Sequence, residues 1–94
     1  MANIPPFSTF YAKTYTAVSD DAFRIEDNPN IVLKSMNVHV YTNDAFYGNS
    51  LIQPGIIVAT GGIWFEANMR PFDLVFKNVN AGQNAVIVIE GPLA

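Results

Sequence analysis

A chain of 94 residues falls within the size range of one domain and is too short for two separate cores. Half of its residues are apolar and only 14% are charged, against roughly a quarter in an ordinary soluble domain, so we expect another protein to cover part of its surface. The net charge of −3 and the five scattered Lys and Arg residues argue against a nucleic-acid or anionic-membrane partner.

The chain contains no cysteine, which excludes disulfides, thiol catalysis and thiolate metal sites. Residues 1–10 lack the basic region and apolar stretch of a secretory signal. No apolar run approaches the roughly 20 residues that span a bilayer. We therefore expect a soluble protein that is made in the cytoplasm.

Residues 1–8 are predicted to form an extended N-terminal arm, and residues 9–94 a single β-sandwich domain. Two prolines in the segment Ile4-Pro5-Pro6-Phe7 favour a polyproline-like arm over a helix or a central strand. Arms of this kind dock on neighbouring subunits. The predicted partner-binding residues of the arm are Ile4, Pro5, Pro6, Phe7 and Phe10.

The first half of the domain is predicted to contain three strands. Residues 9–18 are rich in Thr, Tyr and Phe, which suit a pleated, half-buried surface. Turn residues at 19–21 and 27–30 bound a short strand at 22–26. Residues 31–41 alternate in their second half, which is typical of a half-buried strand. One face carries Met36, Val38 and Val40, and the other Asn37, His39 and Tyr41.

The second half continues with short strands at 45–47, from 57 to 59, at 63–67, at 72–77 and at 85–90. Turns are predicted at 42–44, 53–56 and 60–62, and a Gly/Asn loop at 78–84. In the strand at 72–77, alternation places Phe72, Leu74 and Phe76 on one face and Asp73, Val75 and Lys77 outward.

The closing strand is apolar on both faces, because Val86, Ile87, Val88 and Ile89 follow one another, and such a strand must be covered twice. No segment has a helical period. The predicted fold is therefore all-β: a small antiparallel β-sandwich or a jelly-roll-like barrel with an extended N-terminal arm.

Residues with catalytic chemistry are few and isolated. His39 is the only histidine and has no second imidazole or thiolate to complete a metal site. The pairs Asp20-Asp21 and Glu26-Asp27 could be calcium ligands or a glycosidase pair, but the alternating acidic loop of an EF-hand is absent, and adjacent acids in turns are usually solvated. We predict no enzyme activity, no catalytic or metal-binding residue and no cofactor.

The aromatic residues allow three interpretations, namely core packing, a protein interface or carbohydrate binding. For carbohydrate, the predicted stacking residues are Tyr11, Tyr15 and Trp64. For an oligomer, two strands contain more apolar residues than one core can use. The predicted oligomer interface is Ile63, Trp64, Phe65, Val86 and Val88.

Three segments from about residue 35 onward resemble, in order, a pattern in small β-sandwich virion proteins of tailed bacteriophages. They are residues 43–48 (NDAFYG), 55–62 (GIIVATGG) and 72–76 (FDLVF), followed by a loop at 80–84 before the last strand. The resemblance covers slightly more than half of the chain and leaves the first 34 residues out. It implies a virion component of the capsid decoration (cement) or fibre type, without catalytic residues.

The function expected from these observations is that of a viral structural protein in the virion. In the leading hypothesis it is a capsid decoration protein that assembles as a homotrimer and clamps neighbouring major capsid subunits through its arm and exposed aromatic residues. The alternatives are a phage tail, baseplate or fibre module and, from another class, a carbohydrate-binding module.

Overall fold

The computed structural model describes residues 10–49 and 55–94. These residues form seven strands and a short 3₁₀ helix, which confirms the all-β prediction. None of them belongs to a helix that is long and apolar enough to cross a membrane. In chain order the elements are β1 (Phe10–Thr16), β2 (Met36–Tyr41), β3 (Ala45–Gly48), β4 (Gly55–Ile57), β5 (Gly61–Phe65), the 3₁₀ helix (Pro71–Asp73), β6 (Val75–Asn78) and β7 (Val86–Pro92).

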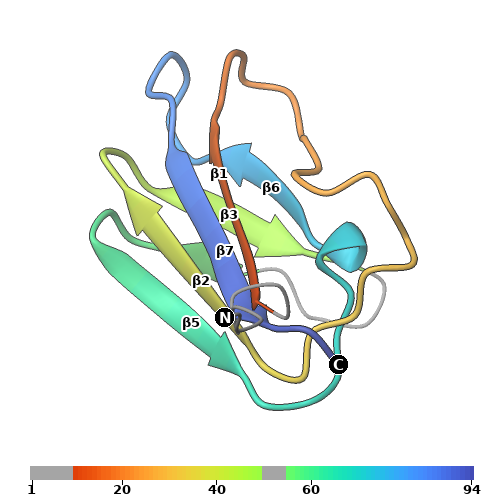
Figure 1. The fold of residues 1–94 in the computed structure, drawn as a ribbon. Helices are drawn as coiled ribbons and strands as arrows, with labels where there is room; N and C mark the ends of the chain where they lie inside the picture. The colour runs from red at the N-terminus through yellow and green to blue at the C-terminus, as the bar shows by residue number, and fades with distance from the viewer. Residues whose placement is uncertain (1–9, 50–54) are drawn as a thin grey trace, which may run out of the picture.

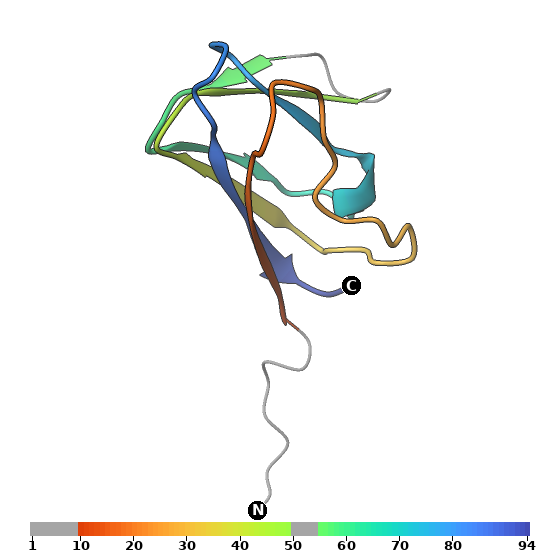
Figure 2. The same ribbon diagram turned by 90° about the horizontal axis from the view of Figure 1, so that it is seen from above.

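The strands form two antiparallel sheets. One has four strands in the order β1-β7-β2-β5, and the other has three in the order β4-β3-β6. Figure 1 shows β7 lying between β1 and β2, and Figure 2 shows the two sheets as two layers. Within the described ranges the sheets are not closed into a barrel, so the jelly-roll-like barrel is not the arrangement that the chain adopts.

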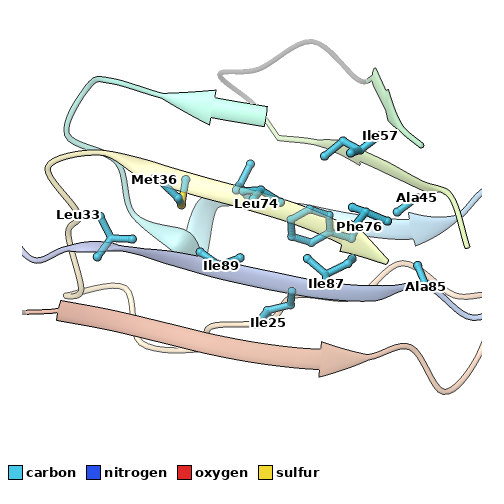
Figure 3. Close-up of a cluster of buried hydrophobic side chains, with 12 residues drawn as sticks. Ile25, Leu33, Met36, Ala45, Ile57, Leu74, Phe76, Ala85, Ile87 and Ile89 are labelled. Carbon is cyan, nitrogen blue, oxygen red and sulfur yellow. The ribbon is translucent and has the colours of Figure 1, made fainter. Parts of the chain in front are cut away.

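A single apolar core serves both sheets (Figure 3). The four-stranded sheet contributes alternate residues of β2 and β7, and the three-stranded sheet contributes residues of β3, β4 and β6. The predicted alternation of β2 is confirmed, because Met36, Val38 and Val40 are buried and the residues between them are not. Each large apolar side chain that is fully buried contributes about 1.5–3 kcal/mol of transfer free energy.

The prediction of a strand at residues 22–26 is wrong. Only Phe23 makes a strand-like pairing there, with Phe76 of β6. The next residues do not continue a strand, and the adjacent residues Ile25 and Glu26 are both buried instead of alternating between a buried and an exposed face. The first part of the predicted strand at 31–41 is also irregular, with Leu33 alone pairing with Met69 and Leu93.

Three other boundaries differ from the prediction. Residues 71–73 form the 3₁₀ helix, since Pro71 stands in its first turn where the fixed φ of proline fits, and β6 begins only at Val75. The turn expected at 60–62 lies earlier, at residues 59–60, with Thr60 in the left-handed region at φ 64°, so both glycines that follow belong to β5. The strand that was predicted to begin at Ile57 instead ends there, as β4.

Candidate functional site

The surface that best fits a binding site is the side of the four-stranded sheet that points away from the core, here called the outer face. Because strand side chains alternate, the residues opposite the buried ones in the strand register share this face. It comprises Phe10, Ala12, Thr14 and Thr16 of β1, Val86, Val88, Glu90 and Pro92 of β7, Asn37, His39 and Tyr41 of β2, and Gly62 and Trp64 of β5.

The outer face carries little charge. Glu90 is its one Asp, Glu, Lys or Arg residue. Trp64 is 52% exposed and lies directly opposite Asn37, and the His39 and Tyr41 rings stack with their centroids 6.3 Å apart. Four strands about 4.8 Å apart and about 20 Å long give roughly 400 Å² of sheet.

The structure brings part of the predicted oligomer interface together on this face. Trp64, Val86 and Val88 all belong to it. Ile63 and Phe65 point the other way and pack, partly buried, against the core of their own chain, so they do not belong to the outer face. Side chains alternate along β5, so Trp64 lies on the outer face and its neighbours Ile63 and Phe65 lie on the opposite side.

The three predicted glycan-stacking residues do not form one platform. Tyr11 and Tyr15 lie on the inner side of β1 and pack against the core, whereas Trp64 is on the outer face of β5. β1 and β5 are also the two opposite edges of the sheet. Tyr15 stacks on Phe23 with ring centroids 4.9 Å apart, so its ring surface is already occupied.

Of the predicted arm residues, only Phe10 lies within the described chain. It begins β1, opposite Pro92, and is exposed on the outer face. Ile4, Pro5, Pro6 and Phe7 lie outside the described residues.

Tyr11 has a structural partner in Glu26, a buried carboxylate of the β1–β2 connection. Glu26 accepts hydrogen bonds from the Tyr11 hydroxyl at 2.8 Å and from the Asn28 backbone N–H at 2.9 Å, and it pairs with the Lys13 ammonium at 3.3 Å. Burial by itself would raise the pKa of Glu26, but these three donors together lower it below its usual range. Burial and the neighbouring carboxylate raise the pKa of the Tyr11 hydroxyl, which stays a donor.

We expect Glu26→Gln to lower the free energy of unfolding at pH 7 by about 1–3 kcal/mol, because hydrogen bonds to a buried charge are lost. A carboxylate whose pKa is lowered by folding stabilises the fold above its unfolded pKa, and that stability disappears as the pH falls through the folded value. The wild-type protein should therefore lose stability from about pH 5 downward, and Glu26→Gln should lose less. Urea unfolding at several pH values measures both, with the exposed Glu66→Gln as the control. A variant whose acid profile matched that of the wild type would contradict this role.

Asp20, one residue of the acidic pair Asp20-Asp21, also has a structural role. Asp20 accepts two hydrogen bonds from the Gly82 backbone N–H, at 2.9 and 3.1 Å, and one from the Asn78 side-chain amide at 3.1 Å. The Asn78 hydrogen bond and then the Gly82 N–H lower the pKa of the Asp20 carboxyl. Asn78 is buried, and its side-chain oxygen accepts from the Ala85 N–H at 3.0 Å. This network ties the turn after β1 to the β6–β7 connection.

No group of three or more His, Asp or Glu side chains among the described residues is placed to hold a metal ion.

A second apolar surface lies where the two sheets approach each other. The sequence analysis did not predict it. Side chains of β3, β4 and β5 line a groove of about 220 Å³ there, called the β4–β5 groove. Ile56 and Val58 at its rim are 56% and 59% exposed. The sequence predicted a turn at 53–56 and a strand from 57, which would have placed these residues differently. The lining residues are Tyr47, Ile56, Ile57, Val58, Gly61, Gly62 and Ile63.

Comparison of the chain with models of protein families, with curated proteins and with solved structures found no match.

Proposed function

We propose that this chain is a viral structural protein with a β-sandwich fold, and that it works as a capsid decoration (cement) protein. It assembles with copies of itself, as a homotrimer, and binds neighbouring major capsid subunits in the virion. A phage tail, baseplate or fibre module would use the same surfaces on different neighbours.

The observation that carries this proposal is the outer face. A sheet surface with an exposed Trp64, two valines and Glu90 as its one Asp, Glu, Lys or Arg residue has the composition of an interface centre, in which aromatic residues are enriched and charges are depleted. Sheets that expose such a face in a small domain are commonly covered by another sheet or subunit, because packing two faces about 10 Å apart removes both from water.

The virion assignment rests on the resemblance of three sequence segments. Residues 43–48 contain β3, residues 55–62 contain β4 and the start of β5, and residues 72–76 lead into β6. These segments therefore lie mainly in the three-stranded sheet and its connections. β1, β2 and the long 17–35 connection lie outside them.

We expect Trp64→Glu to weaken self-association by at least about 30-fold, or 2 kcal/mol, because it places a charge where an aromatic anchor is buried. Sedimentation equilibrium of the full chain, 10.3 kDa per copy, measures the association constant. Val18→Glu is the matched control, since Val18 is highly exposed but belongs to the β1–β2 connection and not to the outer face.

The assembly role is tested on particles. Purified particles that contain the chain should carry it at a copy number close to that of the major capsid protein, and adding it to particles that lack it should raise their resistance to heat. A low copy number confined to the tail would favour the tail or fibre alternative. A monomeric chain that binds no particle would contradict the proposal.

A further inference from the structure

The β4–β5 groove lies between two strand edges. β5 is an edge of the four-stranded sheet and β4 is an edge of the three-stranded sheet, so both have backbone amide and carbonyl groups without a strand partner among the described residues. Free edges of this kind accept extended peptides. Gly61 and Gly62 bring no side chains to the groove, which lets a peptide backbone come close.

The walls of the groove are apolar and partly aromatic. Tyr47 forms one wall, and its ring is held edge-on against Phe65 with the ring centroids 6.5 Å apart. Ile56 and Val58 form the exposed rim. None of the lining residues within the described part of the chain is charged. A cavity of roughly 150 Å³ admits a benzene ring, so a groove of about 220 Å³ has room for one aromatic side chain of a ligand.

The chain itself contains a segment that fits such a groove. Residues 1–9 precede β1 in the sequence. They include Ile4-Pro5-Pro6-Phe7, and none of the nine has a charged side chain. Proline-containing extended segments dock in apolar, aromatic-lined grooves, because little conformational entropy is lost when they bind. The two bulky apolar residues that flank the prolines, Ile4 and Phe7, supply the side chains for the groove.

The strand register shows that a chain cannot place this segment in its own groove. Ile63 is the groove residue nearest to Phe10 in this register. It pairs with Val38, Val38 with Ile89, and Ile89 with Lys13, so Ile63 and Lys13 are level across the sheet. Lys13 is about 10 Å along β1 from Phe10 at about 3.3 Å per residue, and β5 is about 14 Å from β1 at about 4.8 Å per strand. The two displacements combine to roughly 17 Å.

An extended chain spans at most about 3.6 Å per residue, so Phe7 lies no more than about 11 Å from Phe10, and Pro5 no more than about 18 Å. The limit for Phe7 falls short of the distance to Ile63, and the limit for Pro5 barely equals it. Residues 4–7 therefore cannot lie together in the groove of their own copy, whereas the groove of another copy can hold Phe7 together with the prolines.

We propose that the β4–β5 groove of one copy binds residues 4–7 of a second copy. This inference rests on the proposed self-association, and it assigns the arm to a neighbouring copy of the same chain instead of to the capsid surface. The contact is heterologous, because groove and arm are different parts of the chain, and contacts of this type generate closed rings when the rotation between copies closes.

The test uses full-length variants and sedimentation equilibrium. The arm variant carries Ile4→Asp and Phe7→Asp, and the groove variant carries Val58→Asp. Each should reduce the association constant at least tenfold, because a charge is placed in an apolar contact. Val18→Asp, at a valine that is even more exposed than Val58 and lies away from the groove, should leave the association constant unchanged.

Mixing the two variants distinguishes a specific contact from a general effect of added charge. The arm variant retains an intact groove and the groove variant an intact arm, so the mixture should associate more strongly than either variant alone. Mixing that restores nothing, or an arm variant that associates like the wild type, would overturn the inference. An association that depends on Trp64 but not on the arm would overturn this inference and leave the proposed function intact. If the arm and groove variants behave as predicted but the protein binds no particle, the proposed function is overturned and the arm contact is not.

Discussion

Replacing Phe76 by alanine should lower the free energy of unfolding by about 3–5 kcal/mol, the usual cost of removing a buried aromatic side chain together with the cavity that remains. Phe76 is 1% exposed, lies at the centre of the core shared by both sheets (Figure 3) and packs beside Phe23 with ring centroids 6.1 Å apart. A loss of this size is a large part of the stability of a small domain. Urea unfolding followed by tryptophan fluorescence measures it.

Phe46→Ala is the matched control for Phe76→Ala. Phe46 is on the neighbouring strand β3 but points away from the core and is 38% exposed. Its replacement should cost less than about 1.5 kcal/mol, because less apolar surface returns to water and no cavity forms. Equal losses in the two variants would mean that the core is not where the structure places it.

The strands that were correctly predicted from the sequence are those in which the local pattern and the tertiary environment agree. β2 alternates strictly, and one face of it is buried. β7 was predicted to need covering on both faces, yet only Ile87 and Ile89 are fully buried, and Val86 and Val88 are half-buried on the outer face. The sequence predicts that the second face of β7 is apolar. The sequence does not indicate that none of the elements in residues 10–49 and 55–94 covers that face.

The sequence predicts only those features of the candidate site that depend on the alternation of side chains along a single strand. Trp64 and Phe65 lie on opposite faces of β5, as consecutive residues of a strand do. Which side faces the core depends on how β5 pairs with β2, a contact between residues far apart in sequence. The same holds for Tyr11, because its use as a hydrogen-bond donor depends on Glu26, 15 residues away, folding back over β1. The β4–β5 groove requires two different sheets to meet, and no local pattern indicates that.

The end of the chain illustrates the same limit. The closing strand was expected to end at residue 90, but β7 continues to Pro92, and the last residues pair with the segment before β2. The Lys34 N–H donates to the Pro92 carbonyl at 2.9 Å, and the Ala94 N–H donates to the Val32 carbonyl at 2.9 Å. These contacts fix residues 32–35 beside the end of β7, although residues 32–35 themselves have no strand pattern.

Gly91→Ala should therefore be among the most destabilising single changes, by about 3 kcal/mol or more. A Cβ atom at Gly91 would collide with the Ser35 carbonyl oxygen and would lie 3.4 Å from the Met36 Cα atom. All of these neighbours are backbone atoms, so no side chain can rotate away, and relief requires β7 to separate from the start of β2. Because β7 and β2 are the two central strands of the four-stranded sheet, the outer face should be disturbed as well, and self-association should weaken together with stability.

Gly82→Ala is the control that separates the steric collision expected at Gly91 from the general effect of replacing a glycine. Gly82 has a positive φ of 76° in the β6–β7 connection, but a Cβ atom there would meet no other atom within 4 Å. Its replacement should cost only about 1 kcal/mol, the strain of a left-handed non-glycine residue, and should leave the association constant unchanged. Thermal unfolding and sedimentation equilibrium of the two variants provide the comparison. If Gly91→Ala were as mild as Gly82→Ala, the close approach of β7 to Ser35 would be wrong, and the register that defines the outer face would have to be redrawn.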